Sequence, residues 1–314
     1  MKNKYFGDIN DYHKYGLLRV LSNRGKIRTA VCWMRTRDDG PRKDHVPEYL
    51  RQGDKYKSLD PELFESLARC LKTPRRRSIR LARRPGILPF AVPFEGLLPQ
   101  DPDKRRKYIR RLLAKAHECS VVFFDPDTGL KLMWSPRRGK TSGTHLYLDE
   151  VQMTFCSGHS VLVYQHFPRK PRDQFVRDLS NVLCELCHVR IVYSFRTSRV
   201  VFLLVPQLDL LDYFDRCRRK VRRIWGQSFS VTRHRAARKA FWEWAAVDLD
   251  AGLLRALRHR AARMNRSLSD LINATVRQSL AEDLEDLAEF NERAKEPNLA
   301  LEAVLKDSRR RGKL

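Results

Sequence analysis

Two aspartates follow an apolar segment in the run FFDPDTG at residues 123–129. Residues 120–124 are almost wholly apolar, which predicts a buried strand, and the proline and glycine that follow predict a sharp loop. Ligands of open α/β sheets bind where strands end, and a carboxylate there can accept a proton or orient an amine. We therefore predict that Asp125, Pro126 and Asp127 are catalytic. A plain strand-terminating turn is the alternative explanation.

A second strand end carries polar, aromatic and basic groups in the segment GHSVLVYQHFPR at 158–169. Gln165 and His166 stand at the carboxyl end of the strand predicted over 160–165, so we add both to the candidate catalytic residues. If the strands are parallel neighbours, Asp125 and Gln165 share one edge of the sheet. The amino-terminal segment NKYFGDINDY at 3–12 is also rich in hydrogen-bonding side chains.

The surrounding pattern predicts the elements that must position these residues. Apolar strands alternate with amphipathic helices, which indicates an α/β fold with a mostly parallel sheet. Two strands joined by a short polar turn predict a closing hairpin, and helices are expected from there to about Trp244. The expected strands are 27–34, 120–124, 160–165, 189–195 and 199–205, and the expected helices are 10–22, 60–71, 101–117, 148–156 and 171–187.

Composition limits the class of protein and of partner. The 314 residues include 63 Lys and Arg against 37 Asp and Glu, a formal net charge of +26. Residues 245–314 are nearly neutral, with 13 basic and 12 acidic side chains, so the excess lies before them and predicts a polyanion partner such as nucleic acid. The longest apolar run, 200–205, is too short to span a bilayer, and the seven cysteines do not form a disulfide framework. We expect a cytoplasmic protein without membrane contact.

The motifs KYFGDINDY, CWM, FFDPD-G and GHS-LVYQHFPR resemble those of a family of uncharacterised bacterial proteins, over most of residues 1–205. The order of parts is also similar to that of the ribosomal RNA adenine-N6 methyltransferases and the three-Cys-motif partner proteins. In those families a D-P-P-Y or D-P-F-G loop follows the fourth strand and holds the target amine. The resemblance implies a Rossmann-like, methyltransferase-like domain over residues 1–243 with S-adenosylmethionine as its cofactor.

The same resemblance assigns roles to particular residues. Asp125 and Pro126 match the first two positions of the amine-holding loop. The implied cofactor-binding residues are Asp8, Asp11, Asp38 and Asp39. The sequence departs from the pattern at Asp127, where an apolar residue would stack on an adenine. It departs again after the first strand, where TRDDG at 36–40 replaces a glycine-rich loop.

A Mg²⁺-dependent nuclease is the alternative reading of the first domain. Asp125, Asp127 and Glu150 could hold Mg²⁺, and Lys140 could stabilise the charge developing on a phosphate. The C-x-x-C at 184–187 has no second pair, which argues against a zinc site.

The carboxyl-terminal part predicts a separate module. Residues 243–249 (EWAAVDL) suit one strand, and two amphipathic helices follow it. Asp248 or Asp250 would cap the first helix, and the second starts at Ser267. Elements this small cannot bury their apolar faces alone, so we expect a homodimer through residues 243–280. Packing of the same faces against the first domain is the alternative. This strand–helix–helix resembles the ribbon–helix–helix (CopG/Arc-type) DNA-binding domain, and residues 281–314 resemble the toxin-binding tails of type II antitoxins.

The second resemblance implies a module over 244–280 with Trp244, Ala246 and Asp248 on the DNA face. It further implies that Ser267 and Ser269 bind phosphate, and that the tail 281–314 wraps a RelE/ParE-like toxin. The strand lacks the Arg, Lys, Asn or Gln that would read a base edge. The whole sequence thus predicts an antitoxin-like transcriptional regulator fused to a nucleic-acid methyltransferase-like domain. A catalytically inactive first domain with an interaction-only tail is a further alternative.

Overall fold

The computed structural model describes residues 2–36, 46–72, 77–131, 142–236, 249–264, 266–276 and 278–279. The chain divides into two compact units, 1–265 and 266–314, which are described separately. The boundary predicted near residue 243 lies outside the described residues.

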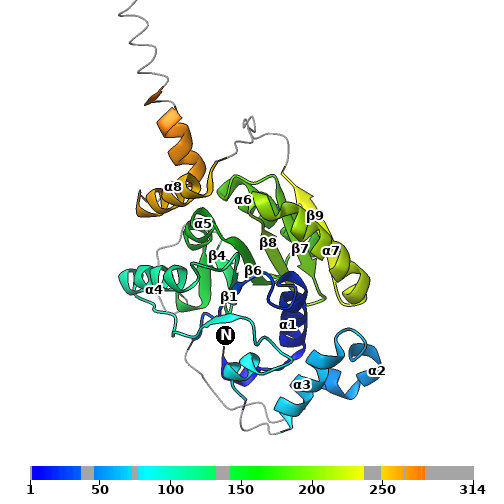
Figure 1. The fold of residues 1–314 in the computed structure, drawn as a ribbon. Coiled ribbons are helices and arrows are strands. Elements are labelled where there is room, and N and C mark those ends of the chain that lie inside the picture. The colour runs from blue at the N-terminus through cyan, green and yellow to red at the C-terminus, as the bar shows by residue number, and fades with distance from the viewer. Residues whose placement is uncertain are drawn as a thin grey trace, which may run out of the picture. The chain divides into compact units, whose positions relative to one another are not determined.

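The first unit is a mixed α/β fold built on a seven-stranded sheet in the order β2-β1-β3-β6-β8-β7-β9 (Figure 1). Strands β2, β1, β3 and β6 pair in parallel, β8 is antiparallel to both β6 and β7, and β9 is antiparallel to β7. Strand β7 therefore runs with the first four, and the predicted mostly parallel α/β sheet is confirmed. The strands are β1 Thr29–Cys32, β2 Val92–Phe94, β3 Val121–Phe124, β6 Ser160–His166, β7 Ile191–Arg196, β8 Val200–Val205 and β9 Ser230–Arg235.

Helices connect and cover these strands. Two of them begin with the same local signal, an aspartate at the N-cap and a proline at the first position: Asp60 caps α3 and Asp101 caps α4. The α-helices of this unit are α1 Ile9–Leu21, α2 Gly53–Tyr56, α3 Pro61–Leu71, α4 Pro102–Lys115, α5 Leu148–Cys156, α6 Arg172–Leu186, α7 Leu211–Trp225 and α8 Ala251–Met264. Short 3₁₀ turns are η1 Asn3–Tyr5, η2 Glu48–Arg51, η4 Ile79–Arg83, η5 Ser142–Thr144 and η6 Leu208–Leu210, and a small parallel pair joins β4 Gly129–Lys131 to β5 His145–Tyr147.

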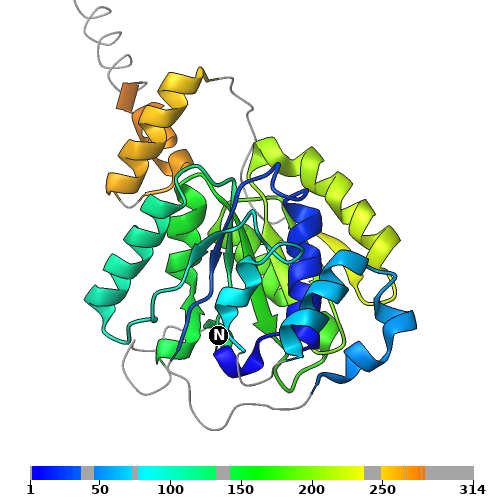
Figure 2. The ribbon, with the colours of Figure 1, turned by 60° about the horizontal axis from the view of Figure 1, so that its bottom comes forward.

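Alternation along the strands creates two cores, one on each face of the sheet. On β1, Val31 packs with α1, α3 and α7, whereas Ala30 and Cys32 pack with α4, α5 and α6. Figure 2 shows the two groups of helices on opposite sides of the strands. Because both faces are covered, the central strands are apolar throughout, which is the pattern that predicted them.

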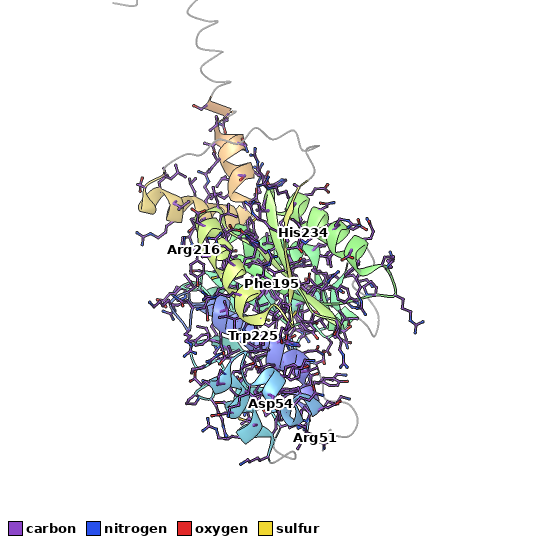
Figure 3. The ribbon with its side chains drawn as sticks, turned by 90° about the vertical axis from the view of Figure 1, so that its right-hand side faces the viewer. Arg51, Asp54, Phe195, Arg216, Trp225 and His234 are labelled. Carbon is purple, nitrogen blue, oxygen red and sulfur yellow. The ribbon has the colours of Figure 1, made fainter. Side chains whose placement is uncertain are left out.

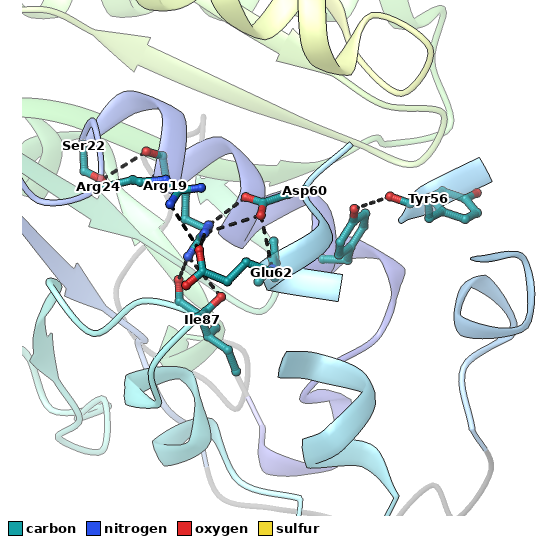
Figure 4. A network of polar contacts seen from close by, with 10 residues as sticks. Arg19, Ser22, Arg24, Tyr56, Asp60, Glu62 and Ile87 are labelled. Atoms are coloured by element: carbon teal, nitrogen blue, oxygen red, sulfur yellow. Dashed lines mark hydrogen bonds and ion pairs between the residues drawn. The ribbon is translucent and has the colours of Figure 1, made fainter. Parts of the chain in front are cut away.

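Helix α1 packs very closely against α7. A Cβ built on Gly16 would lie 2.2 Å from the ring of Trp225, so only glycine fits at this crossing. The same helix is tied to α3 by the buried guanidinium of Arg19, which donates to Asp60 (2.7 Å), to Glu62 (2.6 Å) and to the carbonyl of Ile87 (Figure 4). These contacts fix α1 in position over the sheet.

The structure corrects the prediction of helices from 206 to about Trp244. Residues 230–235 instead form β9, the edge strand beside β7 (Figure 3 labels His234 and Phe195). Residues 230–233 alternate between exposed and partly buried, as expected of a strand with one covered face. Trp244, Ala246 and Asp248 lie outside the described residues, as does the tail 281–314.

Helix α8 begins after Asp250, whose carboxylate accepts from the backbone N–H of Leu253, so Asp250 is the cap of the two that the sequence left open. In the second unit, residues 268–276 are helical, and the Ser267 hydroxyl caps them by accepting from Asp270 N at 2.9 Å. Large apolar side chains are exposed in both segments, including Leu253 (46%) and Val276 (49%). Among the described residues, no helix is both long and apolar enough to span a membrane.

Candidate functional site at the carboxyl edge of the sheet

The order of the strands reverses at β1, because β2 pairs on one side of it and β3 on the other. Ligands of open α/β sheets bind at such a reversal, beyond the carboxyl ends of the strands. Asp125 follows β3 directly and its backbone N–H donates to the carbonyl of Cys32 on β1 (3.0 Å). Gln165 and His166 end the neighbouring strand β6. The predicted sharing of one sheet edge by Asp125 and Gln165 is confirmed.

A buried lysine joins this edge to α1. The Lys14 ammonium contacts Asp11 Oδ1 and Asp125 Oδ2, each at 2.8 Å. All three residues are 2% exposed. Two carboxylates thus share the ammonium of one lysine, in surroundings where water screens them little.

Hydrogen bonds from α1 and the preceding turn hold this group in place. Asp11 Oδ2 accepts from the backbone N–H of Gly7 (2.9 Å) and from the Tyr15 hydroxyl (3.0 Å). Asp8, the N-cap of α1, accepts from Asp11 N (2.9 Å). Burial and the charge of Asp11 raise the pKa of Asp8 to about 6. The carboxylate of Asp8 therefore lies beside Asp11, and the negative charge of Asp11 disfavours the ionised form of Asp8.

The pKa of Lys14 is raised by the negative charges around it, whereas that of Asp125 is raised by burial. Burial lowers the pKa of Lys14, but Asp11 and Asp125 outweigh it and hold the pKa above its usual range. Burial raises the pKa of Asp125 despite the attraction of Lys14. At neutral pH the lysine is charged, and a further cation near this group would be stabilised.

Two rings at the end of β6 lie next to the buried lysine. The Lys14 ammonium lies 4.9 Å from the ring centroid of Tyr164, and Tyr164 in turn contacts the imidazole of His166 edge-on at 4.9 Å. Tyr164 is buried and His166 is exposed. Although the residue as a whole is exposed, partial burial of its imidazole, followed by the charge of Lys14, lowers the pKa of His166.

The loop after Asp125 is held from two sides. Asp127 accepts from the Thr36 hydroxyl (2.5 Å), which links the loop to the segment after β1. Gln165 Oε1 accepts from Leu130 N (2.6 Å). Gly129 has a φ of +99° and a Cβ there would lie 2.3 Å from Gln165, so glycine is required where the loop folds over this amide. Gln165 therefore supports the loop that carries Asp125.

The structure brings most of the sequence-predicted residues of this domain together. The catalytic candidates Asp125, Pro126, Asp127, Gln165 and His166 lie at one edge. Asp11 is joined to this edge by Lys14, and Asp8 contacts Asp11. Asp38 and Asp39 lie outside the described residues.

Sequence reasoning missed Lys14, Thr36 and Tyr164. The spacing of Asp11 and Lys14, three residues apart on a predicted helix, was the available signal for the lysine.

The predicted Mg²⁺ ligands have separate partners. Glu150 on α5 is bound by the buried guanidinium of Arg105 through two hydrogen bonds, of 2.5 and 2.9 Å. Asp125 is bound by Lys14 and Asp127 by Thr36. The part of the chain that the structure describes contains no group of three acidic, histidine or cysteine side chains placed to hold a metal ion. Lys140 lies outside it.

Basic side chains cover the outer surfaces of α4 and α7, on opposite faces of the sheet. Arg105 of α4 is buried, but the exposed basic residues of that helix are Lys104, Arg106, Lys107, Arg110, Arg111 and Lys115. Those of α7 are Arg216 (Figure 3), Arg219, Lys220, Arg222 and Arg223. Asp215 pairs with Arg218 and Arg219 in the first part of α7. The excess of positive charge on this helix therefore lies toward its carboxyl end, at Lys220, Arg222 and Arg223.

Comparison with known proteins gives little further information. No family model and no curated protein matches the chain. The chain is similar to the crystal structure of a Legionella pneumophila protein described by the family model DUF519, at 10% sequence identity and a TM-score of 0.38. The match covers 74% of this chain and 99% of that one. A TM-score this low supports no inference about function.

Proposed function

We propose that the first domain is a methyltransferase that uses S-adenosylmethionine and acts on a base amine of nucleic acid. The observation that carries the proposal is the excess of carboxylates at the strand-order reversal, where Asp11 and Asp125 share the ammonium of Lys14 and Asp8 accepts from the backbone N–H of Asp11. The chain as a whole has a net charge of +26, so this site has the opposite sign to the protein around it. Such a site favours a cationic ligand.

The residues present fit the sulfonium cofactor that the sequence resemblance implies. S-adenosylmethionine is a cation that supplies a methyl group, and the negative group at the ends of β1 and β3 offers it electrostatic stabilisation. Asp125 stands at the first position of a loop similar to those that hold a target amine, and its carboxylate can accept a hydrogen bond from such an amine. Lys14 fixes the orientation of that carboxylate, and Gln165 holds the loop.

The basic surfaces favour nucleic acid as the acceptor. Exposed Lys and Arg side chains on α4 and α7 can contact phosphates, and the counterions they release strengthen binding without regard to sequence. Base specificity must then come from the carboxyl edge of the sheet.

Calorimetry of the full chain tests the cofactor claim. We expect S-adenosylmethionine to bind at least about tenfold more tightly than S-adenosylhomocysteine, in which the sulfur is an uncharged thioether. The reason is that the site is negative, and tenfold in affinity corresponds to about 1.4 kcal/mol. Asp125→Ala should weaken this preference, and Lys26→Ala, an exposed lysine before β1, should leave it unchanged. Absence of binding, or equal affinity for the two compounds, would refute the proposal.

A second function is proposed for the carboxyl-terminal part, that of an antitoxin-like, dimerising DNA-binding regulator. The exposed Leu253 and Val276 and the Ser267 cap favour it, since they match the helices and the helix start expected of a ribbon–helix–helix module. Light scattering of the full chain should give a dimer, and Leu253→Asp should give a monomer. A wild-type monomer at micromolar concentration would contradict this proposal.

A further inference from the structure

A small pocket opens beside the first turn of α1. Its volume is about 290 Å³, near the lower end for ligand clefts, so it suits one small group and not a duplex. Its polar and aromatic lining consists of Asp8, Glu48, Gln52, Tyr49, Tyr56 and Arg199. Carboxylates, tyrosine rings and a guanidinium therefore face the same small volume.

The pocket adjoins the candidate site on the β6–β8–β7 side. Arg199 lies in the turn between β7 and β8 and immediately precedes Val200, which pairs with His166 at the end of β6. Asp8 lines the pocket and also contacts Asp11, which binds Lys14. The strand-order reversal at β1 and β3 lies on the other side of β6. A group in this pocket would thus be next to the carboxyl edge without occupying the reversal itself.

The lining is suited to a nucleobase. The rings of Tyr49 and Tyr56 contact each other edge-on at 5.9 Å, and Tyr49 is held by its hydroxyl, which donates to the carbonyl of Gly7 (3.1 Å). Tyr49 is 4% exposed and stacks on Tyr12, so the partly exposed ring of Tyr56 is the one that offers a platform to an unpaired base. The carboxylates of Asp8 and Glu48 can accept from an exocyclic amine. Arg199 is exposed, and its guanidinium suits a phosphate outside the pocket.

We propose that this pocket binds one unpaired adenine or cytosine of a nucleic-acid strand, with Arg199 on an adjoining phosphate. The carboxylates select bases that present an amine and repel uracil, which presents a carbonyl oxygen in that place. The inference rests on the nucleic-acid acceptor of the proposed function and names the part of the acceptor that is recognised. It does not depend on the cofactor.

Fluorescence anisotropy of the full chain with labelled oligo(A), oligo(C) and oligo(U) of about 12 nucleotides, the size range of a single-strand site, tests the proposal. Oligo(A) or oligo(C) should bind at least about fivefold more tightly than oligo(U). A fivefold difference in affinity is about the lower end of the discrimination that a contact to a base edge gives. Combining Asp8→Ser with Glu48→Ala should abolish the preference and leave oligo(U) affinity no weaker. Serine caps a helix about as well as aspartate, so α1 keeps its cap.

Arg199→Ala should weaken all three oligonucleotides by a common factor, and Lys26→Ala should change none of them appreciably. Equal binding of the three oligonucleotides by the wild type would overturn the pocket assignment, as would a preference that survives the double substitution. Failure of the cofactor claim is a separate result, since it is measured by calorimetry without nucleic acid.

Discussion

Replacing Lys14 by methionine removes the ammonium that Asp11 and Asp125 share and leaves both carboxylates buried. Each contact is 2.8 Å long and all three side chains are at most 3% exposed, so little solvent screening replaces the lost cation. Removing one partner from a buried ion pair destabilises proteins by about 3–5 kcal/mol. Because a domain's free energy of unfolding is about 5–15 kcal/mol, Lys14→Met should remove a large fraction of it.

Urea unfolding at neutral pH measures this loss, with Lys26→Met as the control for removal of an exposed lysine. The control should change the free energy of unfolding by no more than about 0.5 kcal/mol. Adding Asp125→Asn to Lys14→Met should restore part of the stability, because one buried charge is then gone.

The deficit should also depend on pH. Losing Lys14 raises the folded-state pKa of Asp125 further, so the folded variant takes up protons and its deficit shrinks as the pH falls. A loss of less than about 1 kcal/mol at neutral pH would refute the account of a buried, charged triad.

Three further outcomes are expected. Gly16→Ala should lower the free energy of unfolding by about 1–3 kcal/mol through overpacking against Trp225, and an unchanged thermal midpoint would contradict the close crossing of α1 and α7. The pKa of Asp8 is raised to about 6, so its charge appears as the pH rises through that value; affinity for S-adenosylmethionine should rise over the same window in calorimetry and should be flatter in Asp8→Asn. Oligonucleotide binding should fall steeply with salt, and combining Lys107→Ala with Arg111→Ala should reduce the slope of log affinity against log salt by about 2; a salt-independent affinity would contradict the polyanion interpretation.

Elements whose signals are local could be predicted from the sequence. The Asp-Pro pairs at 60–61 and 101–102 mark the starts of α3 and α4, and the apolar runs around Arg196 and Val200 mark the β7–β8 hairpin. Strands β2 and β9 could not be predicted in the same way. β2 contains Pro93, and β9 has a polar sequence, SVTRHR; both lie at edges of the sheet, where neighbours on one side alone determine pairing.

The same distinction holds for the candidate site. Asp125 and Gln165 could be selected because each ends an apolar strand, and parallel strands bring such ends together. Lys14 could not, because its role depends on Asp125, which is 111 residues away in sequence, and on burial that helical periodicity alone does not predict. The charge of the group, and hence the kind of ligand that it favours, became visible only with those contacts.

Methyl transfer is the most direct test of the central claim that Asp125 and its loop form a catalytic edge. Purified full-length protein is incubated with labelled S-adenosylmethionine and single-stranded RNA or DNA, and label on the bases is measured by mass spectrometry. We predict methylation of a base amine by the wild type and by Lys26→Ala, and none by Asp125→Ala, which should remain folded because Lys14 keeps Asp11 as a partner. Undetectable transfer by the wild type to either nucleic acid, or full activity in Asp125→Ala, would contradict the account.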